Sequence, residues 1–296
     1  MKRSLGPGLF FLILFSTHIT AQEIVKDSVP QKDTTVRQKI QTIVRLIIKD
    51  TVSRKETAKD TLLEQQFDNK LYGFRQFRHE TVLFAETPVK WHKADWLRLG
   101  VTVAATAIVM PFDQVFCSEV QSHQSHYYTV PVIIGRIYGS SYFTGTLVAV
   151  SLGYTLITHN AEAKKVDIEL IQAGIYSEVI TEVLKGCIGR ASPNDLRGAF
   201  SYRPFNKFES NFESMPSGDA TLAFAISIIT CRHSKSTFLK ILAFVPAAFT
   251  LFARIYQNEH WASDEVLGAA IGFGTGEWVV NLHEGKRHKI NIPKNN

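Results

Sequence analysis

Apolar residues recur at helical spacing through most of the chain after Asp95. Polar stretches and Gly/Pro pairs divide this region into segments, and none of them shows the strict alternation that is typical of a half-buried strand. The pattern predicts helices over 95–110, 131–157, 163–186, 219–231, 236–254 and 262–281, with a kink at Pro246 in the fifth. We therefore expect an all-α protein built as a six-helix bundle.

The chain before this region has a different pattern. Between Gln22 and Lys70, charged residues alternate with Thr, Gln and Ser, and VRLIIKD is the one apolar cluster. A segment of this composition buries too little apolar surface to fold alone. We expect residues 22–90 to form a flexible polar arm, in which 43–48 can form a short helix, and residues 286–296 to form a basic tail.

The first 21 residues resemble a targeting segment. They combine two early cations, a short apolar run and an alanine at position 21, which is typical of a cleaved secretory signal peptide. The mature chain would start at Gln22 and would be exported. In a bacterium with two membranes, the compartment would be the periplasm, with the protein either dissolved there or associated with a membrane.

Membrane insertion is weakly indicated by the apolar runs. The clearest run, LAFVPAAFTLFA, has about twelve residues, whereas a helix needs about twenty to span a bilayer. Other helical segments carry charged residues, namely Arg136, Asp167, Glu169, Glu178 and Glu182. The pattern favours a water-soluble or membrane-associated core over a polytopic membrane protein.

Charge and cysteine content exclude several classes of function. Removing Lys2 and Arg3 from the 33 basic residues leaves 31 against 27 acidic residues, interspersed rather than clustered, which argues against nucleic-acid binding. Three distant cysteines do not form a disulfide framework. His123 and His126 have a spacing that suits a metal, but without a third ligand nearby they are more typical of a polar loop.

The sequence ARIYQNEHWASDEVLGAAIGFGTG contains Arg254, His260 and Asp264. His260 and Asp264 are four residues apart, so on a helix they share one face. There the aspartate can accept a proton from one imidazole nitrogen and leave the other as a nucleophile, although such a pair alone is usually a surface pair. Glycines follow at 268, 272 and 276, a spacing that lets a second helix approach closely.

Two earlier segments add candidate residues. Lys185 begins KGCIGRASP, and its simplest role is a salt bridge to Glu178 or Glu182. In ESMPSGDATLAFA, a Pro-Ser-Gly turn precedes an apolar helix, whose first N–H groups can hold an anion. Asp219 stands in that first turn, where its carboxylate would compete for the same place.

Together the three segments resemble the type 2 phosphatidic acid phosphatase and vanadium haloperoxidase superfamily. Its pattern is Lys, six residues, Arg-Pro; then Pro-Ser-Gly-His; then Arg, five residues, His, three residues, Asp. The matching positions occur here in the same order, and the third segment is complete: Lys185, Pro193, Pro216, Ser217, Gly218, Arg254, His260 and Asp264. The resemblance covers about residues 90–285 and defines a phosphatase-like helical domain at 91–285.

The resemblance implies both a fold and a mechanism. In a six-helix bundle, His260 would attack a phosphorus atom and become a phosphohistidine, oriented by Asp264. The phosphate oxygens would be held by Lys185, Arg254, Ser217 and Gly218. Positioning and charge stabilisation of this kind suit phosphoryl transfer, and neither a metal nor a cofactor is needed.

Two positions depart from the family pattern, and both make the site more negative. Ser192 stands where the family has arginine, and Asp219 stands where it has the histidine that protonates the leaving group. Asp219 can act as that acid only when it is protonated, which predicts an acidic pH optimum or a poor enzyme. Arg190, two residues before Ser192, is the candidate that would replace the missing cation as a phosphate ligand.

The sequence therefore supports an exported helical phosphatase. Its substrate would be a phosphorylated small molecule or a lipid phosphate or pyrophosphate, which sequence alone does not distinguish. The alternative is a catalytically degenerate member that acts as an envelope binding or scaffold protein, favoured by Ser192 and Asp219. A vanadate-dependent haloperoxidase is the least favoured reading, because a vanadate site needs the cations that this chain lacks.

Overall fold

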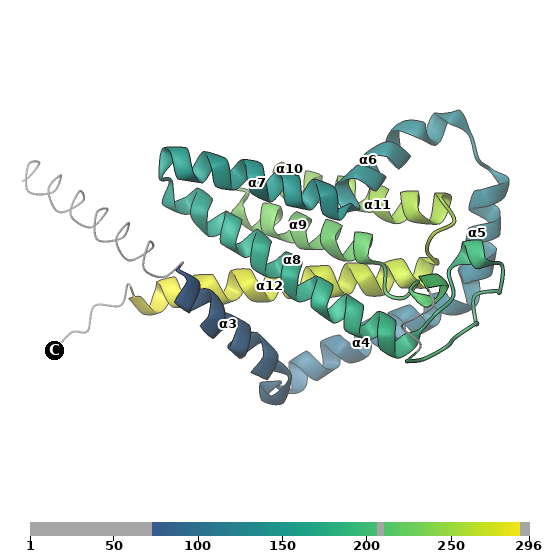
Figure 1. Ribbon diagram of the computed structural model, residues 1–296, viewed down its shortest axis with the longest axis horizontal. Helices are drawn as coiled ribbons and strands as arrows, with labels where there is room; N and C mark the ends of the chain where they lie inside the picture. Colours follow the sequence, from purple (N-terminus) through teal and green to yellow (C-terminus); the bar gives the residue numbers. More distant parts are fainter. Residues whose placement is uncertain (1–72, 206–209, 291–296) are drawn as a thin grey trace, which may run out of the picture. The chain divides into compact units, whose positions relative to one another are not determined.

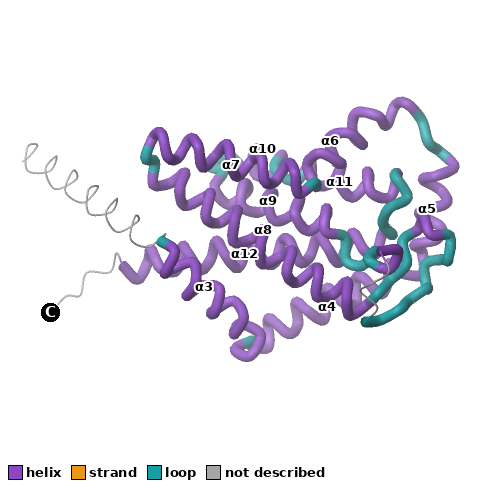
Figure 2. The backbone as a smooth tube through the Cα atoms, in the orientation of Figure 1, coloured by secondary structure: helices purple, strands orange, loops and turns teal. Residues whose placement is uncertain are grey.

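The computed structural model describes residues 73–205 and 210–290, all within one of two compact units, Asp68–Asn296. These residues are mainly helical and contain no sheet, only an isolated bridge between Arg190 and Tyr202 (Figure 2). The all-α prediction is confirmed. The expected signal peptide, residues 22–72 of the expected arm and the last six residues lie outside the described residues.

The helices follow one another along the chain with short connections. In order they are α3 (Phe74–Glu86), α4 (Lys93–Val109), α5 (Asp113–Ser122), α6 (Thr129–Gly139), α7 (Ser141–Thr158), α8 (Ala161–Ile188), α9 (Gly218–His233), α10 (Thr237–Leu242), α11 (Val245–Tyr256) and α12 (Ala262–Ile290). Four of the six expected helices match α4, α8, α9 and α12, although α12 continues into the expected basic tail.

The other two expected helices are each divided in two. The segment predicted as 131–157 breaks at Ser140, whose extended backbone and side-chain oxygen cap α7 by accepting from the N–H of Phe143. The segment predicted as 236–254 breaks into α10 and α11 at Ala243 and Phe244. Pro246 lies in the first turn of α11, where its missing N–H costs no helical hydrogen bond, so it starts a helix instead of kinking one.

Helix α3 lies inside the segment predicted to be a flexible arm. It is followed by a short 3-10 helix, Thr87–Lys90, so the last part of the range 22–90 is ordered. The buried residue of α3 is Glu80, whose carboxylate accepts a hydrogen bond from Gln172 of α8 at 2.6 Å and lies 3.1 Å from His283 of α12. Helix α3 is attached to the bundle by these polar contacts. Its polar sequence had suggested a flexible segment instead.

Helices α8, α9 and α12 form the centre of the bundle (Figure 1). Helix α12 also contacts α4, while α7 packs on α8 and α11 packs on α6. The core between the three central helices consists of Leu170, Ala173, Tyr176, Ala225, Ile226, Ile229, Val279 and Val280. These residues belong to the apolar stripes that the sequence pattern showed, and their mutual contact shields the stripes from water.

Glycines bring α9 and α12 into backbone contact. A Cβ atom on Gly268 would collide with the carbonyl oxygen of Ser217, and one on Gly272 would collide with that of Thr221. The hydroxyl of Thr221 also donates to the carbonyl of Gly268 at 3.1 Å. The predicted close approach is therefore confirmed, and it fixes the start of α9 against the start of α12.

Many large apolar side chains remain exposed on the helices around this core. Helix α4 alone exposes Trp96, Leu97, Val101, Val103 and Ile108. By length and composition, two helical stretches of the described chain, Lys93–Ser122 and Thr237–Tyr256, are apolar enough to cross a membrane. This is weak evidence by itself, since core helices pass the same test.

Candidate active site

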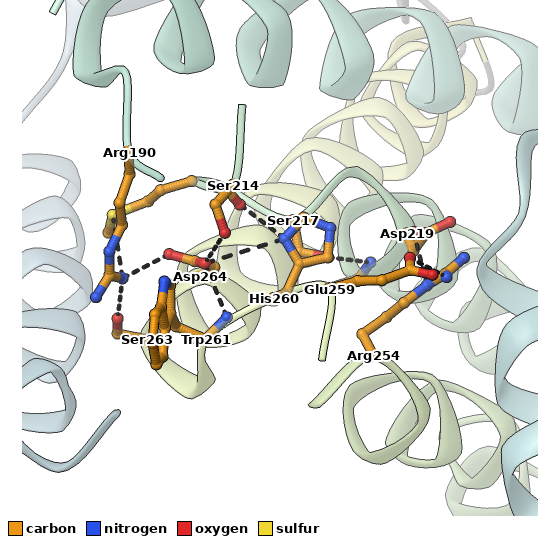
Figure 3. Close-up of polar contacts among 12 residues, drawn as sticks. Arg190, Ser214, Ser217, Asp219, Arg254, Glu259, His260, Trp261, Ser263 and Asp264 are labelled. Atoms are coloured by element: carbon orange, nitrogen blue, oxygen red, sulfur yellow. Dashed lines mark hydrogen bonds and ion pairs between the residues drawn. The ribbon is translucent and has the colours of Figure 1, made fainter. Parts of the chain in front are cut away.

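The candidate residues meet at one end of the central helices. Lys185 lies near the end of α8, Ser217 and Gly218 begin α9, Arg254 is near the end of α11, and His260 precedes α12. Several of them and their polar partners are drawn in Figure 3. Segments that are up to 75 residues apart in sequence are thus brought together, as their shared motif predicted.

His260 lies in the turn before α12 rather than on the helix. Its Nδ1 is 2.8 Å from the carbonyl oxygen of Ser214, and its side chain is 12% exposed. Because a carbonyl only accepts, Nδ1 carries the hydrogen and Nε2 keeps its lone pair. Burial, together with the charges of Lys185 and Arg254, lowers the pKa of His260 to about 3. The imidazole is therefore neutral and suited to act as a nucleophile.

Asp264 contacts His260 less directly than the sequence suggested. Its Oδ2 lies 4.0 Å from His260 Nδ1, which is too far for a hydrogen bond. The same oxygen accepts from the Ser214 hydroxyl at 2.6 Å and from the N–H of Trp261 at 2.9 Å. Ser214 therefore joins the two residues, since its carbonyl holds the imidazole and its hydroxyl holds the carboxylate.

Arg190 lies on the opposite side of Asp264 from His260 (Figure 3). The guanidinium is fully buried and donates to Asp264 at 2.6 Å, to Asp113 at 2.7 Å and to the carbonyl of Ala199. These contacts use its donors, so the geometry does not support Arg190 as a replacement for the cation missing at Ser192. Burial raises the pKa of Asp264 to about 6, and the charge of Arg190 opposes this shift.

The start of α9 forms the expected cradle for an anion. Ser217 is its N-cap, and its side-chain oxygen accepts from the N–H of Ala220 at 3.3 Å, while its own N–H donates to the carbonyl of Asp264 at 3.1 Å. The first N–H groups of a helix have no partner within it. Lys185 Nζ lies 3.6 Å from the point where a Cβ on Gly218 would stand, so a cation faces the cradle.

Acidic residues hold both cations of the site. Arg254 Nε is 2.7 Å from Asp219, and its Nη1 donates to Glu259 at 2.5 Å. Lys185 donates to Glu182 at 3.0 Å, the salt bridge that spacing alone predicted. Burial raises the pKa of Asp219, and the charge of Arg254 lowers it. Without a substrate, the cations that could bind phosphate are therefore neutralised locally.

The structure adds residues that the sequence did not single out for the site. Ser214 and Asp113 support His260 and Asp264 through the contacts described above. Glu178 of α8 places its carboxylate oxygens 3.7 and 3.8 Å from the Cβ point of Gly218. Glu178 lies two helical turns before Lys185. This spacing was the signal in the sequence that could have placed Glu178 at the site, but it was interpreted only as a possible salt bridge.

The remaining candidates concern metal binding and disulfides. His123 is exposed and contacts Ser122 and Glu119 of its own helix. Within the described part of the chain, no cluster of three or more His, Cys, Asp or Glu side chains is arranged to hold a metal ion. Cys117, Cys187 and Cys231 are free.

Comparison with known families assigns the part of the chain that contains the site. Residues 168–288 match the family described as the PAP2 superfamily. The match covers less than half of the chain, so it assigns this segment, rather than the whole chain, to the PAP2 superfamily. The matched PAP2 segment includes all three sequence motifs, from Lys185 to Asp264, and the resemblance recognised in the sequence is confirmed.

Individual relatives are more distant. A lipid A 1-phosphatase from Porphyromonas gingivalis is 33% identical over 90 residues, which are 29% of this chain and only 20% of the relative. The crystal structure of a transmembrane PAP2 type phosphatidylglycerolphosphate phosphatase from Bacillus subtilis has a TM-score of 0.50 at 20% identity, covering 64% of this chain and 94% of that one. Aquifex aeolicus LpxE has a TM-score of 0.44 at 21% identity, over 57% and 95%. At 20% identity the Bacillus subtilis structure supports a similar fold and nothing more.

Proposed function

We propose that this protein is a phosphatase that removes a phosphate group from a lipid through a phosphohistidine on His260. The observation that carries the proposal is the environment of that imidazole. It is neutral, it is held through Nδ1 by Ser214, and it stands beside the α9 cradle and the cations Lys185 and Arg254. The family match of residues 168–288 and the partial match to a lipid A 1-phosphatase support the same chemistry.

The reaction follows in two steps from this arrangement. In the first, the lone pair of His260 Nε2 attacks phosphorus, the ester P–O bond breaks, and the leaving oxygen takes a proton. In the second, water attacks the phosphohistidine, the P–N bond breaks, and phosphate is released. The imidazolium formed in the first step is stabilised by the Ser214 carbonyl and by the nearby Asp264 carboxylate, which Arg190 fixes in place.

Binding of a phosphate requires Arg254 to exchange partners. Asp219 and Glu259 both contact it, and a dianion arriving beside them meets like charge. Protonation of Asp219 removes one of these charges and frees the Arg254 Nε group. Because burial already raises the pKa of Asp219, we expect phosphate binding and activity to increase toward acidic pH.

A lipid substrate fits the surface of the protein. Exposed apolar side chains cover α4, and the stretches Lys93–Ser122 and Thr237–Tyr256 are candidate membrane spans. We propose that these parts associate with a membrane, which would present a lipid headgroup to the site. Export through the expected signal peptide would place this site in the periplasm or at the membrane surface facing it.

The second candidate function is a binding protein that has lost turnover. The observation that favours it is the ion pair between Asp219 and Arg254, which occupies a cation that the reaction needs. Such a protein would bind phosphorylated ligands without releasing phosphate, and this outcome separates the two candidates.

The test measures phosphate release by the purified chain in detergent, from phosphomonoesters, lipid phosphates and lipid pyrophosphates between pH 4 and 8. His260→Ala should abolish release and should also abolish labelling of the enzyme by radioactive phosphate. His123→Ala, a change at an exposed histidine, serves as the control and should leave both unchanged. Release that persists in His260→Ala would contradict the phosphatase mechanism, and the absence of turnover in the native chain would favour the binding protein.

A further inference from the structure

A second acid faces the phosphate cradle from α8. Glu178 lies two turns before Lys185, and both side chains reach the start of α9, where Gly218 provides no side chain to separate them from the helix. A Cβ at this glycine would stand 3.7 and 3.8 Å from the two Glu178 oxygens and 3.6 Å from Lys185 Nζ. A group bound at the first turn of α9 would therefore lie beside a lysine and a carboxyl group.

The contacts of Glu178 differ from those of the neighbouring acid on the same helix. Its Oε1 is buried and has no hydrogen-bond partner among the described residues. Glu182, one turn further on, is 48% exposed and accepts a hydrogen bond from Lys185. A buried carboxyl oxygen without a partner is costly unless the group is neutral or meets a ligand there.

Asp219 is poorly placed to supply a proton at neutral pH. Its Oδ2 is 2.7 Å from Arg254 Nε, and this cation stabilises the ionised form, which cannot donate. Burial raises the pKa of Asp219 all the same. Glu178 differs in that its Oε1 has no hydrogen-bond partner among the described residues. Burial raises its pKa to about 7, Lys185 opposes the shift, and the charges of Glu182 and Asp219 reinforce it. A general acid works best with a pKa near the working pH.

We propose that Glu178 is the acid that protonates the leaving oxygen of the substrate, a role that the sequence pattern had given to residue 219. The inference rests on the proposed phosphatase function. In the first step, as His260 attacks and the P–O bond breaks, the Glu178 carboxyl proton passes to the ester oxygen, so the alcohol leaves neutral. In the second step, the Glu178 carboxylate takes a proton from the attacking water.

The experiment compares two substrates that differ in their need for this proton. The leaving group of para-nitrophenyl phosphate departs readily as an anion, whereas that of an alkyl phosphate needs protonation. The quantity measured is kcat/KM, because it reports the steps up to formation of the phosphoenzyme. Glu178→Gln should lower kcat/KM for the alkyl phosphate by about 100-fold or more, and for para-nitrophenyl phosphate by only a few-fold.

Two variants serve as matched comparisons. Glu182→Gln removes a carboxylate next to Lys185 and leaves Glu178 in place, and Asp219→Asn removes the carboxylate that is paired with Arg254. Both should change kcat/KM for the two substrates by the same factor. Retained inorganic phosphate binding and an undiminished melting temperature in Glu178→Gln would show that the site is intact.

The outcomes distinguish the inference from the function on which it rests. Equal losses for the two substrates in Glu178→Gln, or no loss, would overturn the role of Glu178 while leaving the phosphatase in place. A substrate-dependent loss in Asp219→Asn instead would assign the proton to that residue and overturn the inference. If the native chain shows no His260-dependent release, both proposals are wrong.

Discussion

Replacing Asp219 with asparagine tests how charge is balanced in the candidate site. The side chain is of similar size, so the change removes a negative charge while the start of α9 keeps its shape. In the native protein, Asp219 lies 2.7 Å from Arg254, and Glu259 holds the same guanidinium from another side. The variant should bind phosphate more tightly, because Arg254 keeps one partner and the dianion no longer meets the aspartate.

The size of the effect follows from Coulomb's law. Two unit charges about 4 Å apart repel by about 4 kcal/mol at an effective dielectric near 20. The Asp219 side chain is 23% exposed and its charge is partly neutralised by Arg254, so only part of this repulsion reaches the ligand. We expect a gain of about 1.4 to 2.8 kcal/mol, which is about a 10- to 100-fold lower dissociation constant for inorganic phosphate.

Titration calorimetry or competitive inhibition at pH 7.5 would measure this constant. Because the pKa of Asp219 is raised, more of the native side chain is protonated as the pH falls, and the difference between native and variant protein should shrink toward pH 4. Glu259→Gln is the control for loosening of Arg254 without loss of the charge at 219. Weaker or unchanged phosphate binding in Asp219→Asn would refute the view that this carboxylate opposes the ligand.

Three further predictions concern stability. Arg190→Met should destabilise the fold by about 3 to 5 kcal/mol, since it leaves Asp113 and Asp264 as buried charges without their cation. Arg197→Met is the comparison, because Arg197 is 43% exposed and its loss leaves one partner, Asp195; it should cost clearly less, and equal losses in denaturant titrations would contradict this. Gly272→Ala should lower the melting temperature strongly, because the added Cβ would collide with the backbone of α9. Gly274→Ala is the control, since its Cβ would meet nothing within 4 Å and should leave the melting temperature unchanged. Similar melting curves for the two variants would rule out the close contact. The Glu178 pKa of about 7 lies above its ordinary value of 4.5, so the folded state holds this proton more tightly than the unfolded state. The free energy of unfolding should therefore fall by up to about 3 kcal/mol as the pH rises from 4.5 to 7. Glu178→Gln should remove this pH dependence, and an unchanged dependence would argue against the raised pKa.

The sequence predicted the helices better than their breaks. Periodic apolar residues located α4, α8, α9 and α12, because these helices bury a continuous stripe. The break at Ser140 depends on one capping hydrogen bond, and the start of α11 depends on where Pro246 falls within a turn. Helix α3 was missed because a polar residue, Glu80, is what it buries.

The candidate site shows the same division between local and distant information. Motif spacing identified His260, Lys185 and Arg254, and the structure brings them together. The partners of Arg190 lie 77 and 74 residues away in sequence, so no local pattern could show that its guanidinium is buried. The Ser214 carbonyl that holds His260 is a backbone group, and its role depends on a turn whose path only the fold determines.

The glycine contact between α9 and α12 has a consequence for how the site adapts to different substrates. Ser217 and Asp264 are joined through their backbones, and Thr221 is bonded to Gly268, so the anion cradle and the turn carrying His260 belong to one rigid block. Lys185 and Arg254 come from α8 and α11, outside that pair of helices. We expect adjustment to headgroups of different size to occur in these outer helices, while the distance from nucleophile to cradle stays constant.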